Sequence, residues 1–528
     1  MLKNYFKIAF RNLQRNKIFS FINIVGLALG LACAMLIILY VKDEVSYDRF
    51  HKNVKNIYRI TAIQEYGGQQ HKDGNTGFLQ GPRFTQNVPG IQSFVRVQDG
   101  TEDVKMGSEI ESRNLLYVDS SFFSVFTFPL LSGNPRTCLS EPHSIVLTEE
   151  AAKKQFGTYD AMGKTVMVKE DSAFVPYKVT AVAKNCPQNS SIQFSTLLPF
   201  KESEMDANNN ENWFNFFLNT FVVLEPKATL QAVENQMQKF YVKDASSTFQ
   251  KMIEKYGSGA DEKMGSYALQ PFINMHLSTE LPAQNGLTNA SNPMYSYILS
   301  GIALYILLIA CINFINLTVA RSMKRAKEIG IRKVVGGNRK QLIMQFLGES
   351  FVLCIIAFIL ALVIVQLVLP VFNTLSNKSL ALSYLFDTKL ISGYILLFAL
   401  TTLLAGFYPA LVLSGYSPVQ TLYSRFNLTG KNYLQKSLVV LQFTLASFLI
   451  IATLIIYYQF NYLTTEKLGY DDSNLVLVNK SSLKHDQARL LENELMKDPN
   501  IVGVAAKNNG SWSTQARVNG DSSLQFAY

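Results

Sequence analysis

Charged residues are scarce in this chain. Asp, Glu, Lys and Arg make up 17% of its 528 residues, whereas a soluble protein carries about a quarter. The deficit is concentrated in five stretches without any charge, at 18–41, 297–320, 351–372, 390–413 and 437–458. About 20 apolar helical residues cross a hydrocarbon core of roughly 30 Å, so each stretch is long enough to span. The composition excludes a soluble enzyme, a disordered regulator and a disulfide-rich secreted domain, and it predicts an integral membrane protein.

Histidine and cysteine are also few, with five of each. The histidines are scattered, without an HExxH sequence or another metal-ligand spacing. Three cysteines fall in the apolar stretches, where we expect small packing residues. Cys138 and Cys186 could pair in an oxidising periplasm. We therefore predict no metal site, and the pairing of these two cysteines stays open.

A catalytic or nucleotide-binding signature is lacking too. The nearest match to a phosphate loop is Gly157 followed by Gly163-Lys164-Thr165, with five residues between the glycines where the P-loop has four. We interpret Gly163 as a turn before a strand. No catalytic or cofactor-binding residue is predicted, the chain is not expected to be an enzyme, and any ATP chemistry must come from a partner.

The basic residues lie beside the apolar stretches. Five precede the first stretch, eight follow the second and are opposed only by Glu328, and three lie between the fourth and fifth. Basic flanks mark the cytoplasmic side of a membrane, and the three clusters alternate as five consecutive spans require. We predict a cytoplasmic N-terminus, and the position of the charge excludes nucleic acid as a partner.

The spans divide the chain into successive segments. We expect a cytoplasmic N-terminus at 1–17, a first span at 18–41, a large outer domain at 42–296, a second span at 297–320, a cytoplasmic coupling helix at 321–345, the third and fourth spans within 346–413, a cytoplasmic loop at 414–436, a fifth span at 437–458 and the start of a second outer domain at 459–528. The pattern of residues 1–59 recurs weakly at 423–479, and duplicated halves are common in transporters. We therefore expect the first half of a duplicated protein and the opening of the second.

The outer domain shows alternating strand and helix signals. Residues 144–147 read as a strand, Thr148 as the N-cap of a helix that begins with two acidic residues, and Gly157 as its end. Strands are predicted at 165–168 and 177–183, and an amphipathic helix begins at Leu230. The fold class is an α-helical transmembrane bundle with a large mixed α/β domain between spans one and two.

The most informative segment follows the second span. We expect the second span to leave the membrane as a helix and to continue through Lys324 and Glu328. Lys324 and Glu328, then Glu328 and Arg332, are spaced i,i+4, which favours a helix. Gly336-Gly337 should end it, and a new helix should start near Asn338. A short basic helix at the cytoplasmic mouth could contact a soluble subunit. The alternative is an ordinary positive-inside loop, although charge alone does not explain the sequence Glu-Ile-Gly-Ile-Arg-Lys followed by Gly-Gly.

These residues resemble a known family. Residues 327–337, together with Gln-Phe-Leu-Gly-Glu-Ser at 345–350, are similar to the signature of the FtsX-like (MacB-like) permeases of ABC transporters. Other stretches agree with it: Tyr-Asp-Arg-Phe-His at 47–51, residues 122–133, residues 144–164 and Gly-Phe-Tyr-Pro-Ala at 406–410.

The resemblance implies a permease subunit in the bacterial inner membrane, coupled to a cytoplasmic ABC ATPase that holds ATP and magnesium. By mechanotransmission to the periplasmic domain, it would export or extract an amphiphilic substrate such as a peptide, a drug or a lipid-linked molecule. A periplasmic adaptor or outer-membrane channel is a further implied partner, and relatives of full length are expected to form a dimeric assembly. The implied ATPase-coupling residues are Arg321, Lys324, Arg325, Lys327, Glu328, Ile329, Gly330, Ile331, Arg332, Lys333, Gly336 and Gly337.

The same sequence has two alternative interpretations, a regulatory module and a membrane enzyme. A regulatory module would keep the same architecture but control a periplasmic partner such as a cell-wall hydrolase, without transport. A membrane enzyme would need a paired carboxylate, a nucleophile or a metal signature in the outer domain, and the sequence shows none of these. Copurification with a channel or adaptor favours transport, and copurification with a hydrolase favours regulation.

Polar and small residues inside the spans predict contacts between helices. Gly26 and Gly30 form a GxxxG pair, which permits close helix approach, although an accidental match to this short pattern is the alternative. Asn313 and Asn316 share one face of the second span, which favours hydrogen bonds between helices. Glu349 opens the third span, where it could pair with a nearby basic residue or face water. Pro409 should kink the fourth span.

Overall fold

The computed structural model describes most of the chain. The described residues are 11, 15, 17–66, 69–170, 173–200, 212–256, 263–281, 283–288, 290–336, 338–381, 387–414, 433–466, 474–476, 485–505, 513–518 and 522–527. Within them, the side chains at 65–66, 69, 252, 255–256, 263, 321–329, 332, 412–413, 434–435, 485, 513–518 and 522–527 lie outside the description. The chain forms two compact units, Met1–Ile450 and Ile451–Tyr528, which are treated separately.

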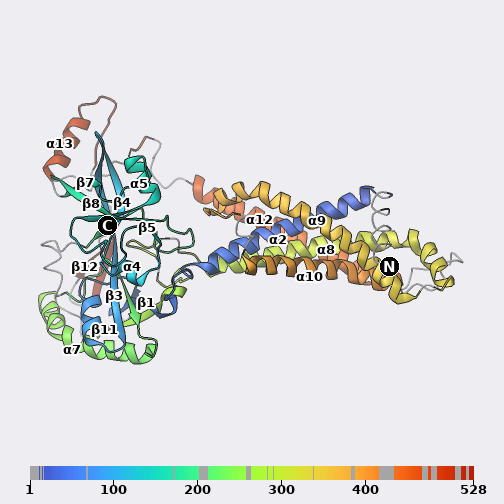
Figure 1. The fold of residues 1–528 in the computed structure, drawn as a ribbon, viewed down its shortest axis with the longest axis horizontal. Helices are drawn as coiled ribbons and strands as arrows, with labels where there is room; N and C mark the ends of the chain where they lie inside the picture. Colours follow the sequence, from blue (N-terminus) through green and yellow to red (C-terminus); the bar gives the residue numbers. More distant parts are fainter. Residues whose placement is uncertain are drawn as a thin grey trace. The chain divides into compact units, whose positions relative to one another are not determined.

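Among the described residues, five helices are long and apolar enough to cross a membrane. Each contains one of the predicted apolar stretches and extends beyond it. The helices are α2 (Lys17–Ser46), α8 (Pro293–Val334), α9 (Arg339–Ser376), α10 (Thr388–Ser414) and α12 (Tyr433–Thr465). In the first unit, α2 packs against α8 and α9, and α10 packs against α8 and α9 (Figure 1). Small residues such as Ala28, Ala357 and Ala361 are fully buried between these helices, which lets the backbones approach closely.

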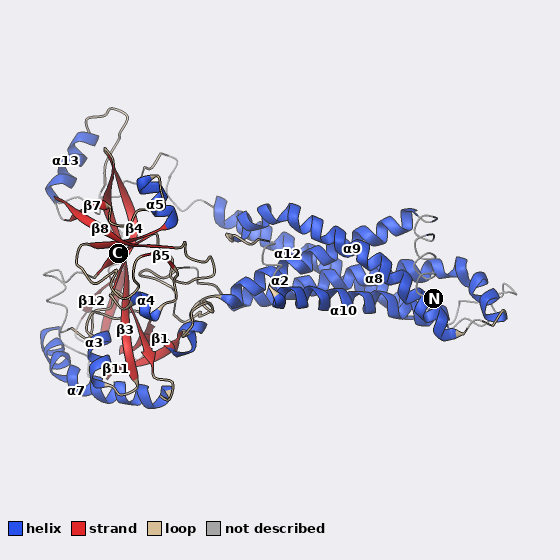
Figure 2. Ribbon diagram, in the orientation of Figure 1, coloured by secondary structure: helices blue, strands red, loops and turns tan. Residues whose placement is uncertain are grey.

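A mixed α/β domain lies between α2 and α8, as the sequence predicts. Figure 2 shows the strands of this domain and the helices beside them. The sheet has the order β11-β1-β10-β3-β4-β9-β6-β8-β5, with β2 paired to β1 and β7 paired to β3 and β8. The pairs β4–β9 and β6–β8 are parallel, and the other pairs are antiparallel. The strands are β1 (Ile57–Tyr66), β2 (Gln69–Asp73), β3 (Ile91–Met106), β4 (Glu109–Val118), β5 (Leu130–Ser132), β6 (Ser144–Thr148), β7 (Thr165–Glu170), β8 (Ala173–Ala183), β9 (Thr196–Pro199), β10 (Asn219–Leu224) and β11 (Lys263–Pro271).

Helices cover this sheet and close its hydrophobic cores. Helices α3 (Gln80–Asn87) and α7 (Leu230–Tyr256) pack over β3, β10 and β11, whereas α5 (Glu149–Phe156) packs over β6 and β8. The short helices η1 (Val54–Asn56), α4 (Phe122–Val125) and η2 (Phe272–Asn274) contribute to the core beneath the sheet. In the second unit, α13 (His485–Leu495) precedes an antiparallel hairpin of β12 (Ser513–Val518) and β13 (Ser522–Ala527).

The local predictions in the α/β domain are confirmed. The Thr148 hydroxyl accepts a hydrogen bond from the Ala151 amide at 3.3 Å and caps α5. Gly157 ends that helix with φ +71°, a conformation that suits glycine. Cys138 and Cys186 are both free thiols, so the pairing considered from the sequence is not formed. The Cys186 thiol instead donates to the Phe194 carbonyl at 3.6 Å.

Candidate coupling site

The basic segment after the second span belongs to two helices. Residues 321–334 continue α8 without interruption, and Arg339 begins α9. The predicted break at Gly336-Gly337 and the predicted new helix near Asn338 are confirmed, so the coupling segment 321–345 is divided between α8 and α9; Gly336 takes φ +97°, and a helix ends at such a residue. Asn338 caps α9, and the side chain of Gln341 accepts from the Asn338 amide at 3.3 Å.

Several predicted coupling residues cannot be placed in detail. Most of the predicted coupling side chains lie outside the described residues. They are those of Arg321, Lys324, Arg325, Lys327, Glu328, Ile329 and Arg332, together with all of Gly337. Gly330 is buried and Ile331 is exposed. Lys333 donates to the Ser414 carbonyl at 2.7 Å, which joins the end of α8 to the end of α10.

The glycine pair in α2 faces α8. A Cβ atom on Gly30 would lie 2.8 Å from the Ala310 Cβ, and one on Gly26 would lie 3.6 Å from the Asn313 side-chain nitrogen. The Asn316 side chain donates to Gln442 of α12 at 3.4 Å. Close approach at glycine and hydrogen bonds between polar side chains are two of the contacts that hold membrane helices together.

The two remaining packing candidates lie in α9 and α10. Glu349 accepts a hydrogen bond from Gln345, one turn earlier in α9, at 3.3 Å. Pro409 lies inside α10, which remains helical through it to Ser414. A Cβ on neighbouring Gly406 would lie 3.0 Å from the Ser350 Cβ, so α9 and α10 also approach closely here.

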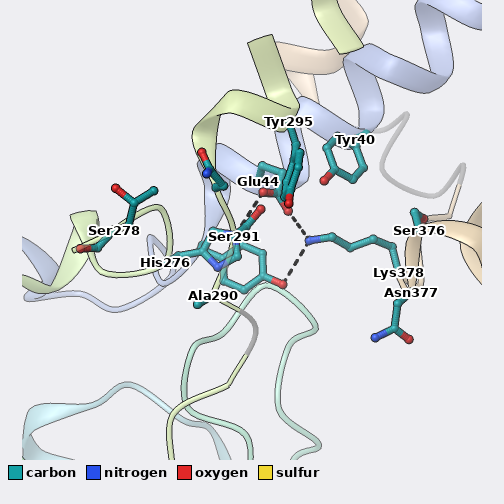
Figure 3. A pocket seen from close by; sticks show the side chains of 13 residues that line it. Tyr40, Glu44, His276, Ser278, Ala290, Ser291, Tyr295, Ser376, Asn377 and Lys378 are labelled. Carbon is teal, nitrogen blue, oxygen red and sulfur yellow. Dashed lines mark hydrogen bonds and ion pairs between the residues drawn. The ribbon is translucent and has the colours of Figure 1, made fainter. Parts of the chain in front are cut away.

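A cluster of buried charges lies at the other end of the helices, where α2 enters the α/β domain. Helix α2 carries Asp43 and Glu44 in its last turn. Lys378, in the loop between α9 and α10, lies 2.6 Å from Glu44 Oε1 (Figure 3). Its ammonium lies 2.9 Å from Asp43 Oδ2. Its ammonium also donates to the Tyr47 hydroxyl at 3.2 Å. The side chains of Lys378, Asp43 and Glu44 are 12%, 2% and 0% exposed, so these ion pairs are shielded from water.

His276 joins this cluster to the domain. Its ring stacks on the Tyr47 ring with centroids 3.4 Å apart, and its Nε2 lies 3.4 Å from Glu44 Oε2. The Ser291 amide, just before α8, donates to the His276 carbonyl at 2.8 Å. A cavity of about 520 Å³ opens beside these groups and is also lined by Tyr40. Figure 3 shows the side chains of Glu44, His276 and Lys378 gathered at this cavity.

The charged cluster favours the protonated form of its lysine. Burial alone would lower the pKa of Lys378. The hydrogen bond to Glu44 and the charge of Asp43 outweigh that effect, and the pKa of Lys378 is raised. The lysine is therefore charged throughout the physiological pH range.

The residues after α2 fix this helix in the domain. Asp48 takes φ +59° and accepts hydrogen bonds from the Ser191 amide at 2.8 Å and the Ser191 hydroxyl at 2.7 Å. Burial raises the pKa of Asp48 to about 6, although the bonds from Ser191 oppose that shift. The Asn189 side chain donates to the Ser46 carbonyl at 3.2 Å.

His51 lies deeper, in an aromatic part of the core. Its Nδ1 accepts a hydrogen bond from the Thr127 amide at 2.9 Å, and its ring lies 5.3 Å from Phe126 and 5.6 Å from Phe272. Burial among these rings lowers the pKa of His51 to about 3. The Tyr-Asp-Arg-Phe-His sequence thus acts as the anchor of α2 in the domain.

The sequence interpretation missed Lys378 and His276. A signal was present for Lys378, since it is a lone base at the start of a short outer loop while Asp43 and Glu44 directly follow the first apolar stretch. Nothing comparable marked His276 among the other histidines. In the described part of the chain, no group of three or more His, Cys, Asp or Glu residues is arranged to hold a metal ion.

Two protein families match this chain. Residues 20–240 match the MacB-like periplasmic core domain, and residues 300–418 match the FtsX-like permease C-terminal family. The first match begins inside α2 and ends inside α7. The second covers most of α8 together with α9 and α10.

Individual relatives agree with these matches. The macrolide export ATP-binding/permease protein MacB of Chromobacterium violaceum is 21% identical over 368 residues, which cover 67% of this chain and 51% of that protein. The chain thus spans about half the length of this relative. The uncharacterised ABC transporter permease YvrN of Bacillus subtilis is 22% identical over 383 residues, covering 67% of this chain and 84% of that protein.

Among solved structures, the periplasmic region of MacB from Actinobacillus actinomycetemcomitans is 16% identical, covers 39% of this chain and 94% of that one, and has a TM-score of 0.26. A score this low does not establish a shared fold. The two family matches, in this order along the chain, and the permease relatives carry the assignment. The chain belongs to the FtsX-like, MacB-like permeases of ABC transporters, and it is a membrane permease with a periplasmic α/β domain.

Proposed function

We propose that this chain couples ATP hydrolysis by a partner ABC ATPase to movement of its periplasmic domain, and thereby exports or extracts an amphiphilic substrate. The observation that carries this proposal is helix α8. It is a single helix of 42 residues that starts at the base of the α/β domain and ends in the basic segment. At about 1.5 Å per residue it is roughly 63 Å long, twice the thickness of a hydrocarbon core.

A helix of this kind can transmit force from the cytoplasmic side. The partner ATPase would dock at the basic end of α8, about 321–337, and would hold ATP and magnesium. Any displacement of that end would reach Pro293 along the same helix, and the close contact of Gly30 with Ala310 would carry α2 along with it. Both helices enter the α/β domain, so it would move relative to the membrane.

The sidedness follows from the charges. The basic clusters before the first span and after the second support a cytoplasmic N-terminus and a cytoplasmic end of α8. The α/β domain would then lie in the periplasm. Relatives named for macrolide and pyoverdine export support an amphiphilic cargo moving outward. A periplasmic adaptor or outer-membrane channel and a two-fold assembly are further parts of this proposal.

A pull-down of the tagged chain from detergent tests the coupling step. Wild type should retain an ABC ATPase, and Glu328→Lys should lose it, because it reverses the one negative charge in the basic segment. Glu466→Lys is the matched control: it changes an exposed glutamate after α12, on the opposite side of the membrane in this topology, and should retain the ATPase.

Two outcomes would contradict the proposal. Retention by Glu328→Lys would move the docking site away from the end of α8. Absence of any ATPase from wild type would refute energy coupling by this chain. If an ATPase binds but deletion of the gene leaves export unchanged and a cell-wall hydrolase copurifies, the regulatory function replaces transport.

A further inference from the structure

We propose that Lys378 is a positioning residue that clamps the outer loop between α9 and α10 to the base of the α/β domain. The clamp consists of Lys378 with Asp43, Glu44 and Tyr47. It would let movement of α9 and α10 reach the domain directly, in addition to movement transmitted through the covalent connections of α2 and α8. This inference rests on the proposed function, since it concerns how movement of the bundle reaches the domain.

The first step in the argument is that Lys378 is held firmly to α9. Asn377 ends that helix with φ +50°, and the Lys378 amide donates to the Asn373 carbonyl at 3.0 Å. The Asn373 side chain donates to the Leu380 carbonyl at 2.8 Å and accepts from the Leu380 amide at 3.0 Å. Leu380 is itself buried. The loop is folded back on the last turn of α9, so Lys378 moves with that helix.

The second step is that the partners of Lys378 belong to the domain base. Glu44 and Tyr47 lie at the junction of α2 with the domain, and both contact His276. His276 follows η2, whose Phe272 is fully buried in the domain core. The Gln188 side chain, from the domain, donates to Asp43 Oδ1 at 3.0 Å. Force applied at Lys378 would therefore reach the core through side chains as well as through α2.

The third step concerns strength. Surface ion pairs contribute little because water and salt screen them, and the nearby pair of Lys42 with Asp387, at 2.8 Å, is of this kind since its carboxylate is 40% exposed. Lys378 differs because both of its carboxylate partners are almost fully buried. Removing the lysine would leave two buried carboxylates without the cation that they share, which is unfavourable although His276 and Gln188 still contact them. The Tyr47 ring adds a cation–π contact, with the ammonium 4.7 Å from its centroid.

The test uses the full chain with its copurified ATPase in lipid nanodiscs. Hydrogen–deuterium exchange is measured with and without ATP in two peptides, one covering 43–51 at the domain base and one covering 376–381 in the loop. ATPase rates are measured in the same samples. The variants are Lys378→Met, Lys378→Arg and the matched control Lys389→Met, which removes an exposed lysine at the start of α10.

In wild type and in Lys389→Met, ATP should change exchange in both peptides. In Lys378→Met, the loop should still respond and ATP should still be hydrolysed, but the ATP-dependent change at the domain base should fall to less than half. Lys378→Arg should restore it, because it keeps the positive charge. If Lys378 only stabilised the fold, Lys378→Met would reduce protection from hydrogen exchange equally with and without ATP. The ATP-dependent difference in exchange would then be unchanged.

If Lys378→Met does not assemble, a double variant is tested instead, in which Lys378→Asp and Asp43→Lys exchange the two charges of the ion pair. Restored coupling in the folded double variant supports the clamp, and lost coupling overturns it. An undiminished ATP-dependent change in Lys378→Met also overturns the clamp while leaving the proposed function intact. If wild type shows no ATP-dependent change in either peptide, the proposed function itself fails.

Discussion

Acid should destabilise the α/β domain through His51. Burial lowers the pKa of His51 to about 3 in the folded domain, from an ordinary value of 6.5. Because the folded pKa is depressed, the unfolded chain takes up a proton that the folded domain refuses, and stability is lost as the pH falls below 6.5. Each pH unit costs about 1.4 kcal/mol. Between pH 6.5 and about pH 4 the free energy of unfolding should fall by about 3 kcal/mol, a large part of a typical 5–15 kcal/mol.

The variant His51→Asn isolates this effect. Its side-chain oxygen can accept the Thr127 amide bond now made to Nδ1, at 2.9 Å in the wild type, and it cannot be protonated. Urea unfolding in detergent, followed by tryptophan fluorescence, reports on the domain through buried Trp213. The sequence has two tryptophans, and Trp512→Phe removes the other one, so that all the fluorescence comes from Trp213.

The wild type should lose about 3 kcal/mol relative to His51→Asn over this pH range. Other titrating groups occur in both proteins and cancel in the difference. His143→Asn is the matched control, because it makes the same substitution at a histidine whose side chain is 55% exposed. A constant difference between wild type and His51→Asn from pH 6.5 to pH 4 would show that the folded core accepts a proton on His51, and would refute the reasoning.

Three further predictions concern single contacts. Asp48 should show the opposite pH dependence: burial raises its pKa from 3.8 to about 6, so its stabilising contribution is complete below pH 3.8 and is lost as the pH rises through 6. Asparagine also tolerates a positive φ. Between pH 4 and pH 7, the free energy of unfolding of Asp48→Asn relative to that of the wild type should therefore rise by up to about 3 kcal/mol in the same urea assay. A difference that does not change with pH would contradict the raised pKa of Asp48. Gly30→Leu should force α2 away from Ala310 and cost about 1–3 kcal/mol of stability, measured as a lower melting temperature in detergent. Gly301→Leu is the control, because a Cβ atom at Gly301 meets nothing within 4 Å. Equal losses of stability in the two variants would argue against the contact of Gly30 with Ala310. Thr148→Ala should remove the cap of α5 and cost about 1 kcal/mol of domain stability in urea, and no change would show that water replaces the cap.

Elements determined by neighbouring residues could be predicted from the sequence. The apolar stretches became helices because a segment in lipid must satisfy its backbone hydrogen bonds within itself, and about 20 apolar residues suffice to cross. The cap at Thr148 and the stop at Gly157 depend on residues within one or two turns. The break at Gly336 likewise follows from the freedom of glycine to take a positive φ.

Helix lengths were less predictable. The continuation of the second span as a helix through Glu328 could be predicted, and α8 extends it to Val334. By contrast, apolar character ends near residue 41, yet α2 continues to Ser46. Charged residues can continue a helix once it has formed, because adding a residue costs much less than starting a new helix. This extension carries Asp43 and Glu44 to the domain base.

Only the tertiary structure decided which charges meet. Lys378 and Asp43 are 335 residues apart in the sequence, and each has several candidate partners of opposite charge. Their pairing depends on the rotation of α2 about its axis, the end of α9 at Asn377 and the position of His276 after η2. The sequence by itself determined that this chain crosses a membrane and carries a folded domain outside it, because hydrophobic burial is set residue by residue along the chain. The buried charge cluster at the domain base was decided by packing, because it exists only where separate elements meet.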